Sequence, residues 1–285
     1  MAGEQEPLSL ANDGGHPRQK QEILPDAAAD RLDVLGPGHA GQSIEGRRSV
    51  TSTIPFMDYV ELTERFIEER FPGAEVAVIG GSTARGTRTK TSDIDLLLIG
   101  DEVFADGASS LAGAWEYDSE VFEVFAYTYD AYTKWARGGI AQYRPVIVDL
   151  LLDGQEVRGG DALTRLREEW GAKLAEGPPI TDHELAMRRY AITDLIDDLR
   201  DATDPLEQNV VAWDLFEKVA DLMLLTDKHW IGTGKYLARR LRELSVSRTE
   251  HLTSPLLQGD LITFADRAEQ ELMRAGGRVH AGFVR

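Results

Sequence analysis

The sequence predicts an α+β fold, in which a half that contains strands is followed by an all-helical half. Short β-branched runs bounded by glycine turns occur only between residues 53 and 155. After Gly154 the apolar residues recur at helical spacing. Residues 1–52 are rich in Gly, Pro, Gln, Asp and His without a sustained period, which predicts a disordered leader. We therefore expect one domain at 53–155 and a helical domain at 156–285.

The first domain is expected to begin with an amphipathic helix that Pro72-Gly73 ends, because its apolar residues recur at helical spacing. Short β-branched or apolar runs then predict buried strands. In the third of these strands Glu123 shares a face with Val121 and Phe125. The expected order is a helix from 53 to 71, strands at 75–79, 93–99, 120–127 and 145–152, and a short helical turn at 83–88.

The second domain is expected to be a bundle of helices. Thr181 and Glu184 have the spacing of a capping box, which predicts that a helix begins there. Gly177-Pro178-Pro179 stops the helix before it. The expected helices are 161–176, 181–202, 206–229, 233–245 and 255–276.

Composition narrows the class of protein. The chain has 285 residues, of which 42% are hydrophobic, enough for a substantial core. No apolar run approaches the ~18 residues of a membrane span, and the first residues lack the apolar core of a signal peptide. We therefore expect a cytoplasmic protein without a membrane partner. With no cysteine and no metal-like histidine spacing, a zinc site is not expected.

The charge balance bears on the partners. The formal net charge is −18, from 31 basic and 49 acidic residues. Non-specific binding of nucleic acid needs basic surface, so this charge argues against a nucleic-acid partner. It favours a small cationic substrate or reflects solubility.

The stretch from residue 80 to 100 combines a flexible turn with a pair of carboxylates. Gly80, Gly81 and Ser82 break a predicted strand, and glycines let the backbone approach a ligand. Free N–H groups at the start of the next helix favour phosphate. Asp93 and Asp95 are two residues apart on the following strand, so they point to one face. Carboxylates at this spacing suit Mg²⁺, which is usually held with substrate phosphates.

The run G-G-S, then Gly86, then S-D-I-D-L at 92–96 resembles the nucleotidyltransferase superfamily of the DNA polymerase beta type. The resemblance implies a small mixed β-sheet flanked by helices in the first domain. It also implies transfer of a nucleoside monophosphate from an NTP, with ATP expected, to a hydroxyl group, and release of pyrophosphate. Ser82 would hold the triphosphate, and Asp93 and Asp95 would hold Mg²⁺.

The family usually has a third carboxylate, and two residues are candidates for it. Glu123 and Asp149 each interrupt an apolar run, where a charge is costly unless it is paired or on a metal. Glu123 is favoured as a metal ligand because its strand is the next in sequence. Asp149 remains the alternative.

The stretch RRYAITDLIDDL at 188–199 carries two further acidic residues. Asp194 and Asp198 are four apart and share one helix face. That face is either a solvated surface or a site that takes a proton from an acceptor hydroxyl. The arrangement resembles kanamycin nucleotidyltransferase and its relatives, in which a helical-domain carboxylate is the base. The resemblance places Asp198 at that position, with Asp194 one turn before it.

Basic residues are expected on the phosphate side of the site. Lys235 follows a glycine-rich turn and shares a helix face with Arg239, which indicates a phosphate clamp or, alternatively, a solvated helix start. Arg85, with Arg88 and Lys90, flanks the glycine turn and either offsets phosphate charge or lies on the surface.

The acceptor is expected to be a hydroxyl-bearing small molecule, with an aminoglycoside-like cation as one candidate. The alternatives are a transferase that modifies a protein or tRNA, as toxin-like relatives do, and a nucleotide-binding regulator without catalysis. Relatives that share a cleft between subunits make a homodimer an expectation as well.

Overall fold

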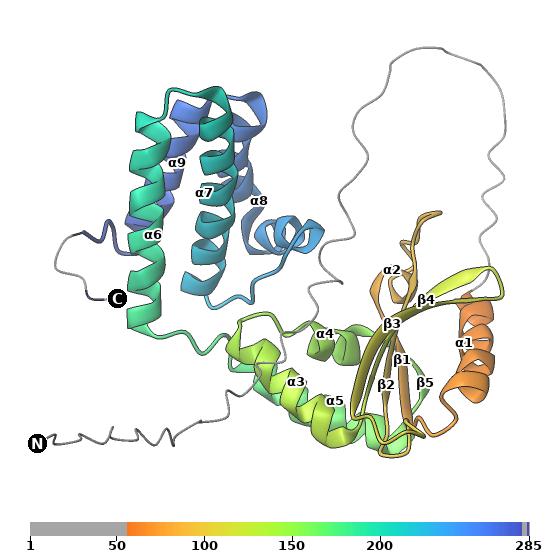
Figure 1. Ribbon diagram of the computed structural model, residues 1–285. Coiled ribbons are helices and arrows are strands. Elements are labelled where there is room, and N and C mark those ends of the chain that lie inside the picture. The colour runs from red at the N-terminus through yellow and green to blue at the C-terminus, as the bar shows by residue number, and fades with distance from the viewer. Residues whose placement is uncertain (1–55, 281–283, 285) are drawn as a thin grey trace, which may run out of the picture. The chain divides into compact units, whose positions relative to one another are not determined.

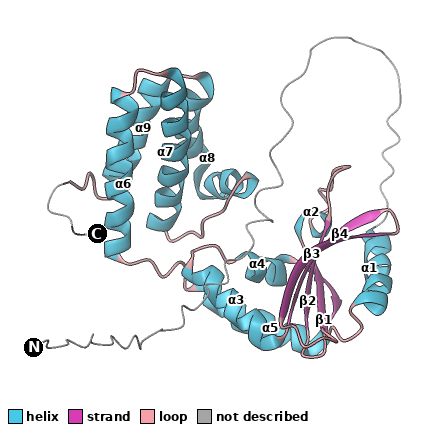
Figure 2. Ribbon diagram, viewed as in Figure 1, coloured by secondary structure: helices cyan, strands magenta, loops and turns pink. Residues whose placement is uncertain are grey.

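The computed structural model describes residues 56–280 and residue 284, and these have the predicted α+β order (Figures 1 and 2). The predicted leader at 1–52 and the predicted start of the first helix lie outside the described residues. The strands are β1 (Val76–Ile79), β2 (Ile94–Ile99), β3 (Ser110–Tyr117), β4 (Glu120–Tyr127) and β5 (Gln155–Arg158). The helices are α1 (Phe56–Arg70), α2 (Gly81–Ala84), α3 (Tyr129–Ala141), α4 (Val146–Asp153), α5 (Gly160–Ala175), α6 (Asp182–Asp201), α7 (Pro205–Thr226), α8 (Lys235–Gln258) and α9 (Leu261–Arg274).

The five strands form one mixed sheet in the order β3-β4-β2-β1-β5. β2 and β4 are parallel, whereas the other neighbouring pairs are antiparallel. The mixed sheet confirms the expectation from the resemblance. In the parallel pair Asp95 lies opposite Glu123, and Ile94 lies opposite Phe122.

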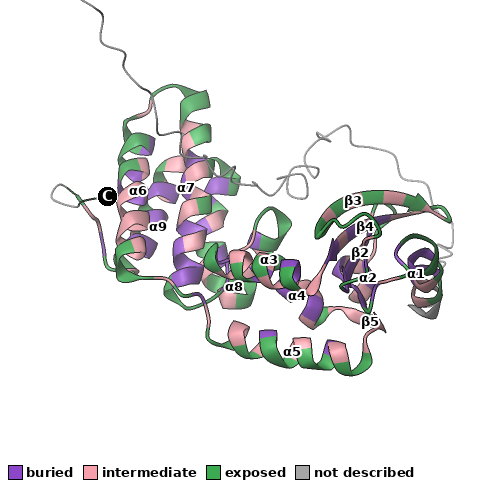
Figure 3. Ribbon diagram, turned by 60° about the horizontal axis from the view of Figure 1, so that its bottom comes forward, coloured by how far each residue is buried: buried purple, intermediate pink, exposed green. Residues whose placement is uncertain are grey.

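Each face of the sheet is covered by helices, because its side chains alternate between two buried cores. Ile94, Leu96 and Leu98 of β2 pack with α1 on one face. Leu97 and Ile99 pack with α3, α4 and α5 on the other. Figure 3 shows how fully β2 is buried in the middle of the sheet. A strand with both faces covered is a rigid place for a functional side chain.

The predicted strand at 145–152 is wrong, because this segment forms the helix α4. A short apolar run fits a buried strand and a buried helix equally well, so its period could not decide. In α4 the buried residues Val148 and Leu151 are three apart, which is helical spacing. The strand beside β1 is instead β5, which the sequence did not predict.

Two other elements of the first domain were not predicted. β3 is an edge strand whose residues alternate between exposed and half-buried, so its apolar signal is weak. α3 begins after Thr128, whose side chain accepts a hydrogen bond from the backbone N–H of Ala131. The helical turn predicted at 83–88 begins earlier, as α2.

The helices after α5, namely α6, α7, α8 and α9, bury a core that is separate from those of the sheet. The predicted capping box is confirmed, since Thr181 and Glu184 exchange their hydrogen bonds at the start of α6. α7 begins with Asp204 as its N-cap and Pro205 in its first turn. The purple residues in Figure 3 mark the sides of α6, α7 and α9 that form this core.

The boundaries predicted for the last two helices differ from the structure. α8 contains the helix predicted at 233–245 and continues to Gln258 through residues for which no helix was predicted, with a break at Ser245, whose φ of −168° and ψ of 113° are extended. The helix predicted at 255–276 corresponds to α9, which begins at Leu261. The Ser245 hydroxyl accepts a hydrogen bond from the N–H of Arg248, so the helix is capped where it restarts. Gly259, in the left-handed conformation, ends α8 beyond Pro255.

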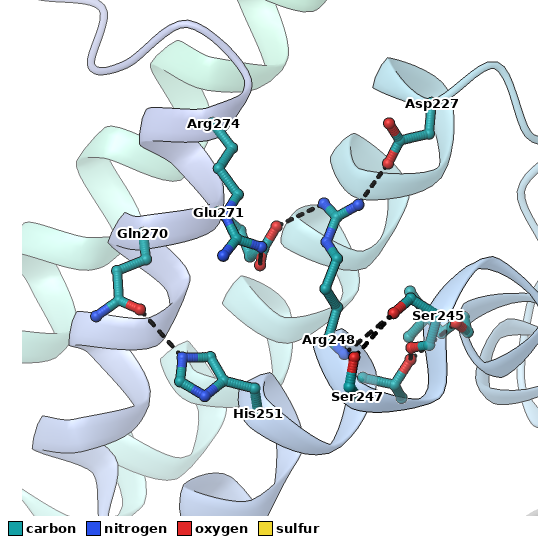
Figure 4. Close-up of polar contacts among 10 residues, drawn as sticks. Asp227, Ser245, Ser247, Arg248, His251, Gln270, Glu271 and Arg274 are labelled. Atoms are coloured by element: carbon teal, nitrogen blue, oxygen red, sulfur yellow. Dashed lines mark hydrogen bonds and ion pairs between the residues drawn. The ribbon is translucent and has the colours of Figure 1, made fainter.

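A buried carboxylate joins α8 to α9 (Figure 4). The Glu271 side chain is only 1% exposed and pairs with Arg248 at 2.6 Å and with Arg274 at 2.9 Å. Arg248 also reaches Asp227, at the end of α7, at 2.6 Å. A charge at such depth is tolerated only when it is paired, so this network fixes the relative positions of the three helices.

Candidate functional site

Three carboxylates meet at the beginning of the paired strands β2 and β4. Asp95 lies within β2 and Glu123 lies opposite it on β4. Both are half-buried, on the face of the sheet that Leu97 occupies further along β2. Asp93 precedes β2 and is exposed. The parallel register therefore brings together acidic groups that are almost thirty positions apart in the printed sequence.

Burial and mutual repulsion disfavour the charged forms of these groups. Burial raises the pKa of Asp95, while the charges of Lys235 and Arg85 lower it. The pKa of Glu123 rises to about 7, first because of burial and then because of the charges of Asp95 and Asp93. Such a group of carboxylates is stabilised by added positive charge.

The glycine turn lies directly against Asp95. The N–H of Gly80 donates a hydrogen bond to the backbone oxygen of Asp95 at 2.7 Å. Gly81 has a φ of +58°, and a Cβ added to it would overlap the Asp95 carboxylate. Ser82 follows in α2 and is half-buried. Glycine at position 81 thus allows both the turn and its close approach to the acidic group.

Three cations surround one exposed aromatic ring beside this turn. The ring centroid of Tyr236 lies 6.0 Å from Arg85, 5.7 Å from Lys235 and 5.2 Å from Arg239. In the described part of the chain, no carboxylate lies within ion-pair distance of these three cations. Tyr236 is 41% exposed. Unpaired cations on a protein of net charge −18 form a ready site for an anion.

Sequence reasoning did not identify Tyr236. The signal that could have found it is the spacing K-Y-x-x-R from Lys235 to Arg239, which places an aromatic residue between two basic ones on one helix. An aromatic residue at an exposed helix start has no role in a core.

Arg88 connects the loop that carries Asp93 to the start of β4. Its guanidinium donates to the backbone oxygen of Ser92 at 2.6 Å and pairs with Glu120 at the start of β4. It also lies over the ring of Tyr59, 4.6 Å from the centroid. Arg88 is therefore half-buried and paired, which contradicts the surface position that was one of its two expected roles. The other expected role, to offset phosphate charge, stays a prediction. Lys90 is exposed.

Residues 60–152 match the family model of the nucleotidyltransferase domain. This part of the chain extends from α1 to α4 and contains the glycine turn and all three carboxylates. Lys235 and Tyr236 lie outside it.

One solved structure adds a comparison over more of the chain. A nucleotidyltransferase-like protein from Exiguobacterium sibiricum is 15% identical, with a TM-score of 0.40. The alignment covers 76% of this chain and 74% of that one. No curated protein matches the chain.

The donor chemistry of the acidic group fits the Mg²⁺ expected from the sequence. The acidic group offers only oxygen atoms, the ligands that Mg²⁺ prefers. Among the described residues no group of three or more acidic, histidine or cysteine side chains has gathered as a preformed metal site. Mg²⁺ usually needs only one or two carboxylates when phosphates supply the other oxygens, so Asp95 and Glu123 suit an ion that arrives with the nucleotide.

The other candidate for the third carboxylate lies elsewhere. Asp149 is on α4 and pairs with Arg240 of α8 at 2.5 Å. Burial raises its pKa to about 6, and Arg240 opposes that rise. Asp149 is not among the charges that shift the pKa of Asp95 or of Glu123. It has a structural partner already, whereas Glu123 has only like charges and Lys235 around it.

The two carboxylates predicted as the base are on α6. Asp194 and Asp198 are both exposed. Neither is among the charges that shift the pKa of Asp95 or Glu123. The structure brings Asp93, Asp95, Glu123, Arg85 and Lys235 into one electrostatic group, and their roles and those of Asp194 and Asp198 stay predictions.

Proposed function

We propose that the chain transfers a nucleoside monophosphate from an NTP to a hydroxyl group of a small molecule and releases pyrophosphate. The observation that carries the proposal is the register of β2 and β4, which sets Asp95 opposite Glu123 directly beside the turn at Gly80 and Gly81. The match to the nucleotidyltransferase domain over residues 60–152 supports the class of reaction.

The proposed roles follow from the charges. Ser82 donates its hydroxyl hydrogen to the triphosphate, while Arg85 and Lys235 pair with phosphate oxygens. Asp93, Asp95 and Glu123 would hold Mg²⁺, which when bound supplies Lewis-acid stabilisation of the phosphate oxygens. ATP is the NTP that we expect.

In the proposed reaction an acceptor oxygen bonds to the α-phosphorus while the bond from this phosphorus to the bridging oxygen breaks. Negative charge then grows on the departing pyrophosphate. In this proposal Lys235 and Arg85, whose charges act on Asp95, lie close to where that charge develops and stabilise the transition state more than the bound NTP. The hydroxyl proton passes to a carboxylate, for which Asp198 or Asp194 is our candidate.

The acceptor that we propose is a small molecule, for which the net charge of −18 favours a cationic, aminoglycoside-like compound. The same charge opposes nucleic acid as a partner. Cytoplasmic location, a homodimer and closeness to the kanamycin nucleotidyltransferase group remain predictions. Among the described residues no helix is long and apolar enough to cross a membrane.

The proposal is tested by transfer of label from α-labelled NTPs with Mg²⁺ to a panel of aminoglycosides, tRNA and cell-extract protein. Asp95→Asn should lower transfer at least ~100-fold, because it removes a carboxylate that would hold Mg²⁺ against the phosphates. The matched control is Glu116→Gln, which removes an exposed acid of β3 and should transfer normally. Circular dichroism of both variants checks the fold.

The possible outcomes separate the candidate functions. Equal transfer by wild type and Asp95→Asn would refute the carboxylate assignment. Label on protein or tRNA alone would replace the small-molecule acceptor with that class. Tight NTP binding without pyrophosphate release would favour a regulator that lacks catalysis.

A further inference from the structure

The ring of Tyr236 connects two parts of the chain that are far apart in sequence. Arg85 ends the short helix of the glycine turn, and its backbone N–H donates a hydrogen bond to the oxygen of Gly81 at 3.4 Å. The guanidinium carbon of Arg85 lies 6.0 Å from the centroid of the Tyr236 ring, which belongs to the first turn of α8. The ring is therefore a contact between the glycine turn and the helical domain.

Two more cations reach the same ring from α8 itself. Lys235 is the first residue of this helix and Arg239 follows four residues later, so both project from the same side. The ammonium nitrogen of Lys235 lies 5.7 Å from the ring centroid, and the guanidinium carbon of Arg239 lies 5.2 Å from it. These distances lie within the range of cation–π attraction. Three side chains of like charge are thus gathered around one ring.

The ring attracts these cations without neutralising them. An aromatic face attracts a cation through its quadrupole, whereas a carboxylate in the same place would cancel the charge. The neighbouring arginines Arg88 and Arg240 pair with Glu120 and Asp149. Among the described residues the three cations around the ring form no such ion pair, although the chain has 49 acidic and only 31 basic residues. Their charge is available to a polyanion.

Packing does not explain why an aromatic residue occupies position 236. The Tyr236 side chain is 41% exposed, whereas Leu237 beside it is buried and contributes to the core of the helical domain. The side chains of Arg85, Lys235 and Arg239 are exposed as well. The cluster is therefore open to a ligand.

The position of the cluster suits one part of an NTP. The charges of Lys235 and Arg85 act on Asp95, and that of Lys235 also acts on Glu123. In the proposed reaction the α-phosphorus lies at these carboxylates, which repel the other two phosphates. The cations are the nearby groups that attract them.

We propose that Tyr236 is a positioning residue whose ring holds Arg85, Lys235 and Arg239 together for the pyrophosphate part of the NTP. This inference rests on the proposed function and adds a residue that acts on phosphate only through the cations that it orders. Without the ring, three like charges separate into solvent, and a nucleotide has to order them as it binds.

The test is calorimetric binding of inorganic pyrophosphate to the full chain. Tyr236→Leu removes the ring and keeps every charge, and we expect it to weaken pyrophosphate about 10-fold, which corresponds to about 1.4 kcal/mol. Tyr236→Phe keeps the aromatic face and should bind within about 2-fold of wild type. The control is Trp213→Leu, which removes a 49% exposed aromatic side chain from α7 and should change nothing. Circular dichroism checks the fold of each variant.

A double-mutant cycle shows whether the ring acts through the cations. Arg239→Gln alone should weaken pyrophosphate about 10-fold, because it removes one of the charges. Adding Tyr236→Leu to Arg239→Gln should weaken binding by only about a further 3-fold, since one of the groups that the ring orders is already gone. Two residues that bind pyrophosphate independently would instead give a loss of about 100-fold together.

Four results would each overturn the inference. They are wild-type affinity in Tyr236→Leu, an equally large loss in Tyr236→Phe, independent effects in the cycle, and no binding of pyrophosphate by the wild type. Label transfer by the wild type is measured in parallel. Absence of transfer contradicts the proposed function, whereas normal transfer together with any of the four results contradicts only the positioning role of Tyr236.

Discussion

Lys235 is the residue through which the helical domain reaches the carboxylates of the sheet. It is the first residue of α8, and its charge lowers the pKa of both Asp95 and Glu123. A cation in this position does two things. It reduces the repulsion among the acidic groups, and in the proposed reaction it would also pair with phosphate.

We predict that Lys235→Ala raises the KM for NTP about 10-fold and lowers kcat by a similar factor, because charge that supports the leaving pyrophosphate is lost. Steady-state rates of pyrophosphate release at several NTP concentrations measure both constants. Lys134→Ala, which removes an exposed lysine of α3, is the control and should behave as wild type. A normal KM and kcat in Lys235→Ala would remove this residue from the site.

At the scale of elements, Arg88 links three of them. It contacts Tyr59 of α1, the loop that ends at Asp93, and Glu120 at the start of β4. Since Glu123 lies three residues further along β4 than Glu120, this cross-link restrains the distance between Asp93 of the loop and Glu123 of the strand. Its guanidinium has the flat, multiply donating shape that such a link requires.

Arg88→Lys should therefore keep the fold but disturb the acidic group, because a lysine cannot serve the carbonyl, the carboxylate and the ring together. We expect the Mg²⁺ concentration for half-maximal activity to rise about 5-fold, while the KM for NTP at saturating Mg²⁺ stays the same, a loss of about 1 kcal/mol in metal binding. Mg²⁺ titrations of activity and thermal melts test this. An unchanged Mg²⁺ requirement would leave Arg88 with a purely structural role.

The elements also show what the sequence could and could not predict. Two local patterns were predicted correctly. They are the capping box at Thr181 and Glu184 and the alternation of faces along the strand that carries Glu123. The segment of α4 was predicted as a strand, because its apolar run has no period that distinguishes a buried helix from a buried strand. The pairing of β5 with β1 is a long-range choice that no local pattern contains.

The candidate site also has one part that local sequence predicts and another that depends on long-range packing. The glycine turn and the two aspartates are neighbours in sequence and could be grouped by spacing alone. The approach of Lys235 to Asp95, and the pairing of Asp149 with Arg240, depend on how α8 packs. The basic spacing around Tyr236 was present in the sequence, but its approach to Arg85 could not be predicted, because Arg85 belongs to a distant part of the sequence.

At the scale of the whole molecule, a network of ion pairs connects α6, α9 and the segment that follows α9. Glu269 of α9 pairs with Arg200 of α6 at 2.6 Å and with Arg278, beyond α9, at 2.7 Å. Arg278 also reaches Asp197 of α6 at 2.8 Å. The hydrogen bond from Arg278, followed by that from Arg200, lowers the pKa of Glu269 from its usual 4.5 to about 2.

A lowered pKa in the folded state means that ionised Glu269 stabilises the fold at pH values above 4.5. That contribution is lost as the pH falls from 4.5 through 2. Glu269→Gln should cost about 1 kcal/mol at pH 7, since the pairs are partly exposed but form a network, and should flatten the loss of stability below pH 4.5. Urea unfolding from pH 7 to pH 2.5 measures both effects. The control is Glu250→Gln, an exposed acid of α8. An acid profile identical to wild type would show that Glu269 does not stabilise the fold.

The pairing of β1 with β5 has a consequence for how the protein is made. Val78, two residues before the glycine turn, pairs with Glu156, so the outer edge of β1 has no partner until the ribosome has released β5. β2, β3 and β4 can assemble well before that point. A nascent chain that pauses ahead of Gln155 therefore displays an open strand edge, the kind of surface on which growing chains associate wrongly and chaperones act. β1, which leads into the glycine turn, is therefore the last inner strand of the sheet to gain both of its neighbours.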